Sequence, residues 1–191
     1  MKTIIIISLI LVSMFFTSCN ETSTNNNPIE IIPLNIGNKW LYSVKSLDDS
    51  VVKANQILKD TLLQGEKWFI MNLDGVPVFI AQNKPDGLWI FRKSTAYPDG
   101  KAVLFYKYPA KVGDSYDIDT IKISVLSIRD TIQVIGGTYT CYHYQTLYGQ
   151  QEKYDEYLAP GIGAIKLLAY KFVSGQWQLV ETTEFISAIL K

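Results

Sequence analysis

Residues 67–82 read KWFIMNLDGVPVFIAQ, two apolar runs on either side of an Asp-Gly pair. Asp74 and Gly75 readily adopt the positive φ angles of a two-residue hairpin turn, so the pattern predicts antiparallel strands at 67–73 and 76–82. Pro77 cannot donate a ladder hydrogen bond, and we expect it at a strand start or on an edge. This stretch therefore indicates an antiparallel β-sheet.

The same alternation of apolar runs and turn residues continues on both sides of the hairpin, without helical periodicity. Ser174 and Gly175 are expected to close one further hairpin, and Arg129 and Asp130 another. Residues 187–190 either extend the last strand or form a short helical turn. The further strands are expected at residues 39–45, 51–63, 88–93, 102–108, 121–128, 131–135, 139–148, 164–173 and 176–185.

Near a dozen antiparallel strands in one domain must curl or close, because a flat sheet of that width leaves edges and one face uncovered. The sequence therefore predicts an all-β fold, built as a single domain of mostly antiparallel strands. We expect a strongly curved meander or a barrel-like sheet.

The N-terminus follows the pattern of a bacterial lipoprotein signal peptide. Lys2 precedes an apolar run from Ile4 to Phe16, and two small residues lie directly before Cys19. As a helix this run would rise about 20 Å. A transmembrane helix needs roughly 20 apolar residues, or about 30 Å, so the run is too short to span a bilayer. We therefore predict that residues 1–18 are removed and that Cys19 carries the lipid, such as palmitate. An ordinary secretory signal is the alternative.

The segment after Cys19 has nothing apolar to bury up to Pro28. Residues 19–30 are thus expected to form a disordered tether in front of a domain at residues 31–191. Two or three acyl chains hold a protein firmly at a bilayer. We expect a monomeric lipoprotein of the outer membrane of a Gram-negative bacterium, facing the periplasm or the cell surface.

Charge and cysteine content exclude several classes of partner. The chain holds 18 basic and 18 acidic side chains, and removing residues 1–18 takes away one Lys and no acid. A net charge near −1 argues against a nucleic-acid partner. Once Cys19 is lipidated, Cys141 is the remaining cysteine and no disulfide can form within the chain. Cys141 is interpreted as a small buried apolar residue.

Four short motifs occur along the domain: GNKWLY at 37–42, VGDSY at 112–116, GGTY at 136–139 and APGIGAIK at 159–166. In this order they resemble a family of bacterial exported lipoproteins to which no activity is assigned. The resemblance spans nearly the whole domain. It implies an all-β, barrel-like domain in the periplasm or at the cell surface, and it brings no catalytic residue.

Two of these motifs also resemble each other. Gly37 with Asn38 and Gly113 with Asp114 are turn pairs, and each Gly is followed at the third position by an aromatic residue that begins a strand, Trp40 and Tyr116. Duplication of an ancestral half and chance are alternative explanations.

Catalytic and metal sites are not indicated by the residue pattern. Cys141 and His143 would share one face of a strand, but they are too few to hold a metal, and no third group is evident to orient them. The segment around Asp114 lacks the Gly and Glu of a calcium loop. We expect no enzyme, cofactor or metal. The alternative is a carboxylate-dependent hydrolase, if acids converge across a cleft from the pairs Asp155–Glu156 or Glu181–Glu184.

Aromatic content is the remaining indication of function, with four Trp and twelve Tyr. Tyr142, Tyr144 and Tyr148 share one parity of a strand, and Cys141 and His143 share the other. Both faces are amphipathic, so the pattern leaves open which one is inside. We name the three tyrosines as candidate ligand-facing aromatics. The expected role is non-catalytic binding of a small apolar, glycan or protein partner in the envelope, and the alternative is a structural or assembly accessory of an envelope complex.

Overall fold

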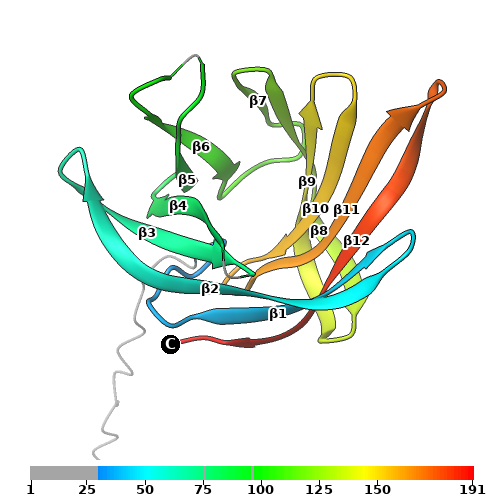
Figure 1. Cartoon of the computed structure of the whole chain (residues 1–191), viewed down its shortest axis with the longest axis horizontal. Coiled ribbons are helices and arrows are strands. Elements are labelled where there is room, and N and C mark those ends of the chain that lie inside the picture. The colour runs from blue at the N-terminus through cyan, green and yellow to red at the C-terminus, as the bar shows by residue number, and fades with distance from the viewer. Residues whose placement is uncertain (1–29, 75, 96) are drawn as a thin grey trace, which may run out of the picture.

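The computed structural model describes residues 30–74, 76–95 and 97–191, so the predicted signal peptide and Cys19 lie outside the described residues (Figure 1). The described residues form one sheet of twelve antiparallel strands, which confirms the all-β prediction. In chain order the strands are β1 Lys39–Ser46, β2 Ser50–Leu63, β3 Glu66–Leu73, β4 Val76–Lys84, β5 Gly87–Arg92, β6 Lys101–Lys107, β7 Ser115–Ile118, β8 Ile121–Val134, β9 Gly137–Tyr148, β10 Glu152–Ala159, β11 Gly163–Val173 and β12 Gln176–Ile189. No helix in this described part has the length and hydropathy to span a bilayer.

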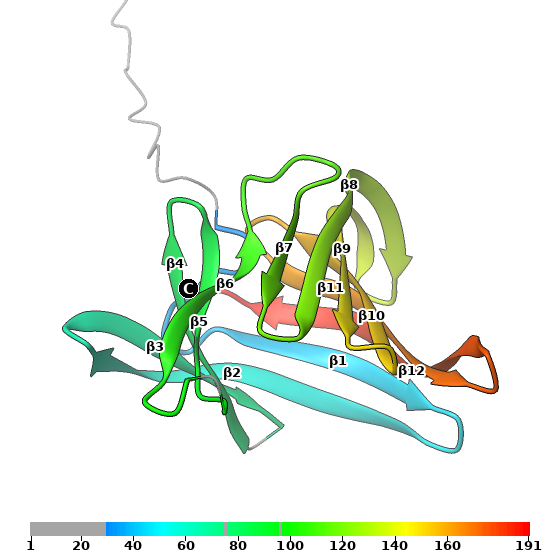
Figure 2. The ribbon, with the colours of Figure 1, turned by 90° about the horizontal axis from the view of Figure 1, so that it is seen from above.

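The sheet is a meander that curls into a nearly closed barrel. Its strand order is β6-β5-β4-β3-β2-β1-β12-β11-β10-β9-β8-β7, so the first strand pairs with the last. Figures 1 and 2 show the two ends of the sheet, β6 and β7, approaching each other across the remaining gap between the ribbons.

Turn chemistry accounts for two of the hairpins that the sequence predicted. Asp74 has a φ of 52°, and Ser174 and Gly175 have φ values of 51° and 85°, the left-handed region that two-residue hairpin turns require. The last strand continues to Ile189, so residues 187–189 extend it.

The predicted hairpin across Arg129 and Asp130 is wrong. Strand β8 runs without a turn through these residues, and its register against β9 shifts between Val125 and Ser127 and again between Ser127 and Asp130. Neither position is a glycine, and Arg129 does not favour the positive φ angle of a tight turn, so the chain bends through β-bulges and continues. Strand β10 was not expected as a separate element.

The two halves of the sheet repeat one another. Gly37 N donates to Ile57 O over 2.9 Å, and Ile57 N donates to Asn38 O over 2.9 Å. The second half has the same pair of bonds at Gly113 N–Val125 O and Val125 N–Asp114 O, over 2.9 and 2.8 Å. A register shift follows directly after both Ile57 and Val125. Strands β1–β6 and β7–β12 therefore have equivalent order and share this pair of turn bonds and the register shift that follows it, which favours duplication over chance.

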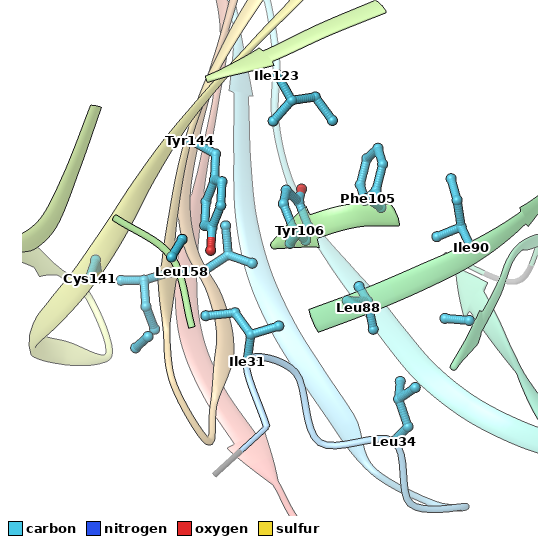
Figure 3. Close-up of a cluster of buried hydrophobic side chains, with 14 of the residues drawn as sticks. Ile31, Leu34, Leu88, Ile90, Phe105, Tyr106, Ile123, Cys141, Tyr144 and Leu158 are labelled. Atoms are coloured by element: carbon cyan, nitrogen blue, oxygen red, sulfur yellow. The ribbon is translucent and has the colours of Figure 1, made fainter. Parts of the chain in front are cut away.

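The segment before β1 closes one end of the barrel. Ile31 and Leu34 are buried in the core beneath the strands (Figure 3). At the same end Asn38 Oδ1 accepts from Lys191 N over 2.8 Å, and Asn35 Nδ2 donates to Lys191 O over 2.8 Å. The first described residues and the C-terminus are thus held together at this end.

Candidate functional site

The tyrosines of β9 line the enclosed side of the sheet. The rings of Tyr144 on β9 and Tyr106 on β6 have centroids 5.0 Å apart, and Figure 3 shows them next to each other. Because β6 and β9 are not neighbours in the sheet, this contact crosses the barrel. Side chains alternate along a strand, so Tyr142 and Tyr148 lie on the same inner face as Tyr144. The structure therefore brings the three sequence-predicted aromatics to one surface.

Their environments differ along the strand. Tyr144 is fully buried, and its hydroxyl donates to Lys107 O over 2.7 Å. Tyr142 is half-buried and packs edge-on against Tyr108, with ring centroids 5.2 Å apart. Tyr148 is 37% exposed. Tyr144 is therefore part of the core, whereas Tyr148 keeps part of its side chain exposed.

Tyr148 is paired with a second partly exposed tyrosine on the next strand. Tyr154 on β10 packs edge-on against it, with ring centroids 5.3 Å apart, and the Tyr154 hydroxyl lies 3.3 Å from Glu152 Oε2. Burial, followed by the charge of Glu156, raises the pKa of Tyr148 to about 12, so its hydroxyl stays protonated at neutral pH. The pair presents aromatic faces and hydroxyl donors together.

Glu156 lies deeper on the same face. Its Oε1 accepts from Tyr106 Oη over 2.5 Å, and its Oε2 accepts from Thr146 Oγ1 over 2.7 Å. Burial raises the pKa of the Glu156 carboxyl above its ordinary value of 4.5, although both hydrogen bonds favour the ionised form. Glu181 is on the same face as Tyr154, because both residues pair with Ala169 on β11. The charge of Glu181 also contributes to the raised pKa of Tyr154. The inner surface near Tyr148 thus combines aromatic rings with carboxylate acceptors.

Tyr116 bridges the gap between the two ends of the sheet. Its hydroxyl accepts from Lys107 N over 3.0 Å and donates to Phe105 O over 2.8 Å. Strands β6 and β7 are not paired as neighbours, so this phenol takes the place of a ladder bond. Burial raises the pKa of Tyr116, which keeps the bridging proton in place.

His143 belongs to a polar network on the opposite, outer face. Its Nδ1 lies 3.4 Å from Asp130 Oδ2, and its Nε2 lies 3.3 Å from Asp155 Oδ1. Asp155 also accepts from Gln145 Nε2 over 3.0 Å and lies 3.4 Å from Lys153 Nζ. Burial opposes ionisation of Asp155, but the hydrogen bonds and the nearby cation outweigh it and lower the Asp155 pKa. Both ring nitrogens of His143 are thus directed at carboxylates.

Cys141 is buried, as its sequence context predicts. Burial raises the pKa of its thiol to about 12, and its Sγ lies 3.8 Å from Tyr139 O. A protonated thiol is a poor nucleophile. The Cys141–His143 pair that the spacing permits therefore combines a weakly nucleophilic thiol with an imidazole that faces two carboxylates.

The acid pairs of the hydrolase alternative are separated by the sheet. Asp155 faces the outer network, whereas Glu156 faces the barrel interior. Glu184 is bound to Lys166 Nζ over 2.9 Å, and Glu181, three residues away, lies on the opposite face. Across residues 30–191, apart from 75 and 96, no group of three or more His, Cys, Asp or Glu is arranged to hold a metal ion.

The sequence pattern does not place Glu156 and Tyr154 on the surface around Tyr148. It also does not predict that Tyr116 bridges the two ends of the sheet. Tyr154 and Glu156 share a parity on β10, a strand that the turn residues of the sequence do not predict. The Tyr116 bridge depends on where β6 ends, which no local pattern encodes.

No protein-family model matches the chain, and no curated protein sequence matches it. Two solved structures are similar to it. A candidate lipoprotein from Parabacteroides distasonis is 14% identical over 84% of this chain and 99% of its own, with a TM-score of 0.47. A candidate exported protein with a YmcC-like fold from Bacteroides fragilis is 11% identical over 85% of this chain and 100% of its own, with a TM-score of 0.45. At these identities and TM-scores no residue role or activity is carried over from either protein.

Proposed function

We propose that the chain is an exported lipoprotein, held at the outer membrane by acyl chains on Cys19, whose barrel-shaped domain binds a small ligand without catalysis. The single observation that carries the binding role is the Tyr148–Tyr154 pair on the inner face, where ring surface is accessible beside Glu152 and above Glu156. The anchor is supported by the leader sequence at residues 1–18, which directly precedes Cys19.

The chemistry of the surface defines the class of ligand. Tyrosine rings supply flat amphipathic faces at a low cost in side-chain entropy, and nearby carboxylates accept hydrogen bonds from hydroxyl or amide donors. A sugar has both a C–H face for stacking and hydroxyl donors at its edge. We therefore take a glycan as the ligand, in preference to a purely apolar molecule, which would not use the remaining acceptor capacity of these carboxylates.

A non-catalytic role is supported by the placement of the acids. The paired acids of the sequence face opposite sides of the sheet, and Glu156 already accepts from two hydroxyls. Glycoside hydrolysis needs two carboxyl groups facing one bond from either side.

Calorimetric titration with oligosaccharides of N-acetylated hexosamines tests the proposal. We expect Tyr148→Ala and Tyr154→Ala each to weaken binding about two- to tenfold, since aromatic stacking contributes roughly 0.5 to 1.5 kcal/mol per contact. Tyr170→Ala is the matched control, because that ring lies under Lys153 on the outer face. Absence of binding to these sugars, or equal weakening by Tyr170→Ala, contradicts the glycan assignment. Titration with decanoate separates a purely apolar ligand from a sugar.

A further inference from the structure

Two neighbouring hairpins, β1–β2 and β11–β12, project from the barrel. Figures 1 and 2 both show their tips extending from the same side of the molecule. They are adjacent because β1 pairs with β12, as far as Ser46 opposite Glu181. The turn of the β11–β12 hairpin is formed by Ser174 and Gly175.

The internal repeat shows that this length exceeds what the sheet needs. Strand β1 has 8 residues and its counterpart β7 has 4. Strands β11 and β12 have 11 and 14 residues, whereas their counterparts β5 and β6 have 6 and 7. The equivalent elements in the other half complete their part of the sheet without such extensions. The added length is therefore available for another purpose.

The β11–β12 extension carries exposed apolar side chains. Phe172 is 45% exposed, Trp177 37% and Leu179 45%, and the rings of Phe172 and Trp177 contact each other edge-on with centroids 5.1 Å apart. Phe172 and Trp177 are paired across the hairpin and share a face. Val173, 43% exposed, lies on the other face by strand alternation. Apolar surface thus surrounds the tip.

Basic side chains lie behind this apolar tip. Lys171 is exposed two residues behind Val173, about 7 Å along the strand. Lys153 Nζ lies 4.0 Å from the centroid of Tyr170 and 5.8 Å from that of Trp177. Glu152, across from Lys171, keeps the net charge at the base of the hairpin small.

We propose that the tip of the β11–β12 hairpin is a lipid-contacting surface that places Phe172 and Trp177 in the headgroup region of a bilayer. A membrane surrounds an inserted tip, which suits apolar side chains on both faces, whereas a protein partner that docks on a sheet covers a single face. Interfacial segments bury their apolar residues about 5 to 10 Å deep with cationic side chains at the headgroups, which matches the position of Lys171. Leu47, Asp48 and Asp49 form the neighbouring β1–β2 turn, and the two adjacent carboxylates oppose insertion of that hairpin.

The orientation is compatible with an anchor at Cys19. The tip lies at one end of β12, and the segment from Glu30 to Asn35 lies near Lys191 beyond the other end. The eleven Cα–Cα steps from Cys19 to Glu30 reach at most about 40 Å. The 14 residues of β12 extend about 47 Å, so a domain lying on its side satisfies both attachments. The inference rests on the proposed envelope location, but its test does not require the lipid.

Sedimentation with vesicles tests the surface directly. The probe is vesicles of phosphatidylethanolamine and phosphatidylglycerol, mixed with residues 19–191 carrying Cys19→Ser so that no acyl chain contributes. We expect the protein to bind the vesicles, and the pair Phe172→Ser and Trp177→Ser to lower the partition coefficient at least about tenfold. The pair Val112→Ser and Ile135→Ser is the matched control, because both side chains are exposed elsewhere on the molecule, and it should leave binding unchanged.

A second measurement locates the contact. Brominated lipids quench a tryptophan that they contact. They should therefore lower the emission of the wild-type protein more than that of Trp177→Phe. Failure to bind vesicles, equal loss in the control pair, or absence of this quenching overturns the proposal. Crosslinking of residue 177 to an envelope protein, without vesicle binding, assigns the tip to a protein partner instead. Loss of fatty-acid labelling at Cys19 would contradict the anchor but would leave this result intact.

Discussion

Replacement of Tyr116 by Phe tests how the barrel is closed, because the change removes one oxygen and leaves the ring in place. That oxygen accepts from Lys107 N over 3.0 Å and donates to Phe105 O over 2.8 Å. Each bond contributes about 1 kcal/mol net, and a partly buried backbone group that loses its partner costs more than that average. We therefore expect Tyr116→Phe to lower the free energy of unfolding by about 2 to 3 kcal/mol.

The effect should be local as well as global. Urea unfolding measures the free energy, and native-state hydrogen exchange should show the Lys107 amide exchanging at least about tenfold faster. Tyr170→Phe, which removes a phenol hydroxyl from the outer face, is the matched control and should change stability by less than about 0.5 kcal/mol. A change below about 0.5 kcal/mol in Tyr116→Phe, with unaltered exchange at Lys107, would refute closure of the barrel by this phenol.

Two further substitutions probe buried titratable groups. The pKa of Glu156 is raised in the folded protein, so its contribution to stability is present below the ordinary value of 4.5 and is lost as the pH rises through the folded pKa. The stability of Glu156→Gln relative to wild type, measured by thermal unfolding, should therefore improve as the pH rises from about 4 to about 8. A difference that does not vary with pH would show that burial does not perturb this carboxyl. Cys141→Ala should cost only packing energy, about 1 to 2 kcal/mol by denaturant unfolding, and complete loss of a cellular phenotype with the fold intact would instead indicate a role for the thiol.

Local turn chemistry made most of the strands predictable. Asp74 and the Ser174–Gly175 pair specify hairpins because these residues adopt the positive φ angles that two-residue turns require. Arg129 and Asp130 were misleading because a polar pair between apolar runs also marks a bulge inside a continuous strand. Whether a strand turns or bends there depends on its partner, β9, which a local pattern does not reveal.

The candidate site was predictable in composition but not in geometry. The shared parity of Tyr142, Tyr144 and Tyr148 follows from the alternation of a strand. Assigning them to the interior required the contact of Tyr144 with Tyr106, which joins strands distant in the sheet. The separation of Asp155 from Glu156 follows from parity once β10 is known.

The most direct test of the account is the mass and acylation of the native product. Cells fed radiolabelled palmitate should yield a labelled mature chain that begins at Cys19, and Cys19→Ser should abolish the label and accumulate unprocessed precursor. An unlabelled native product with an unmodified N-terminus still at Met1 would contradict export, the anchor and the envelope role together.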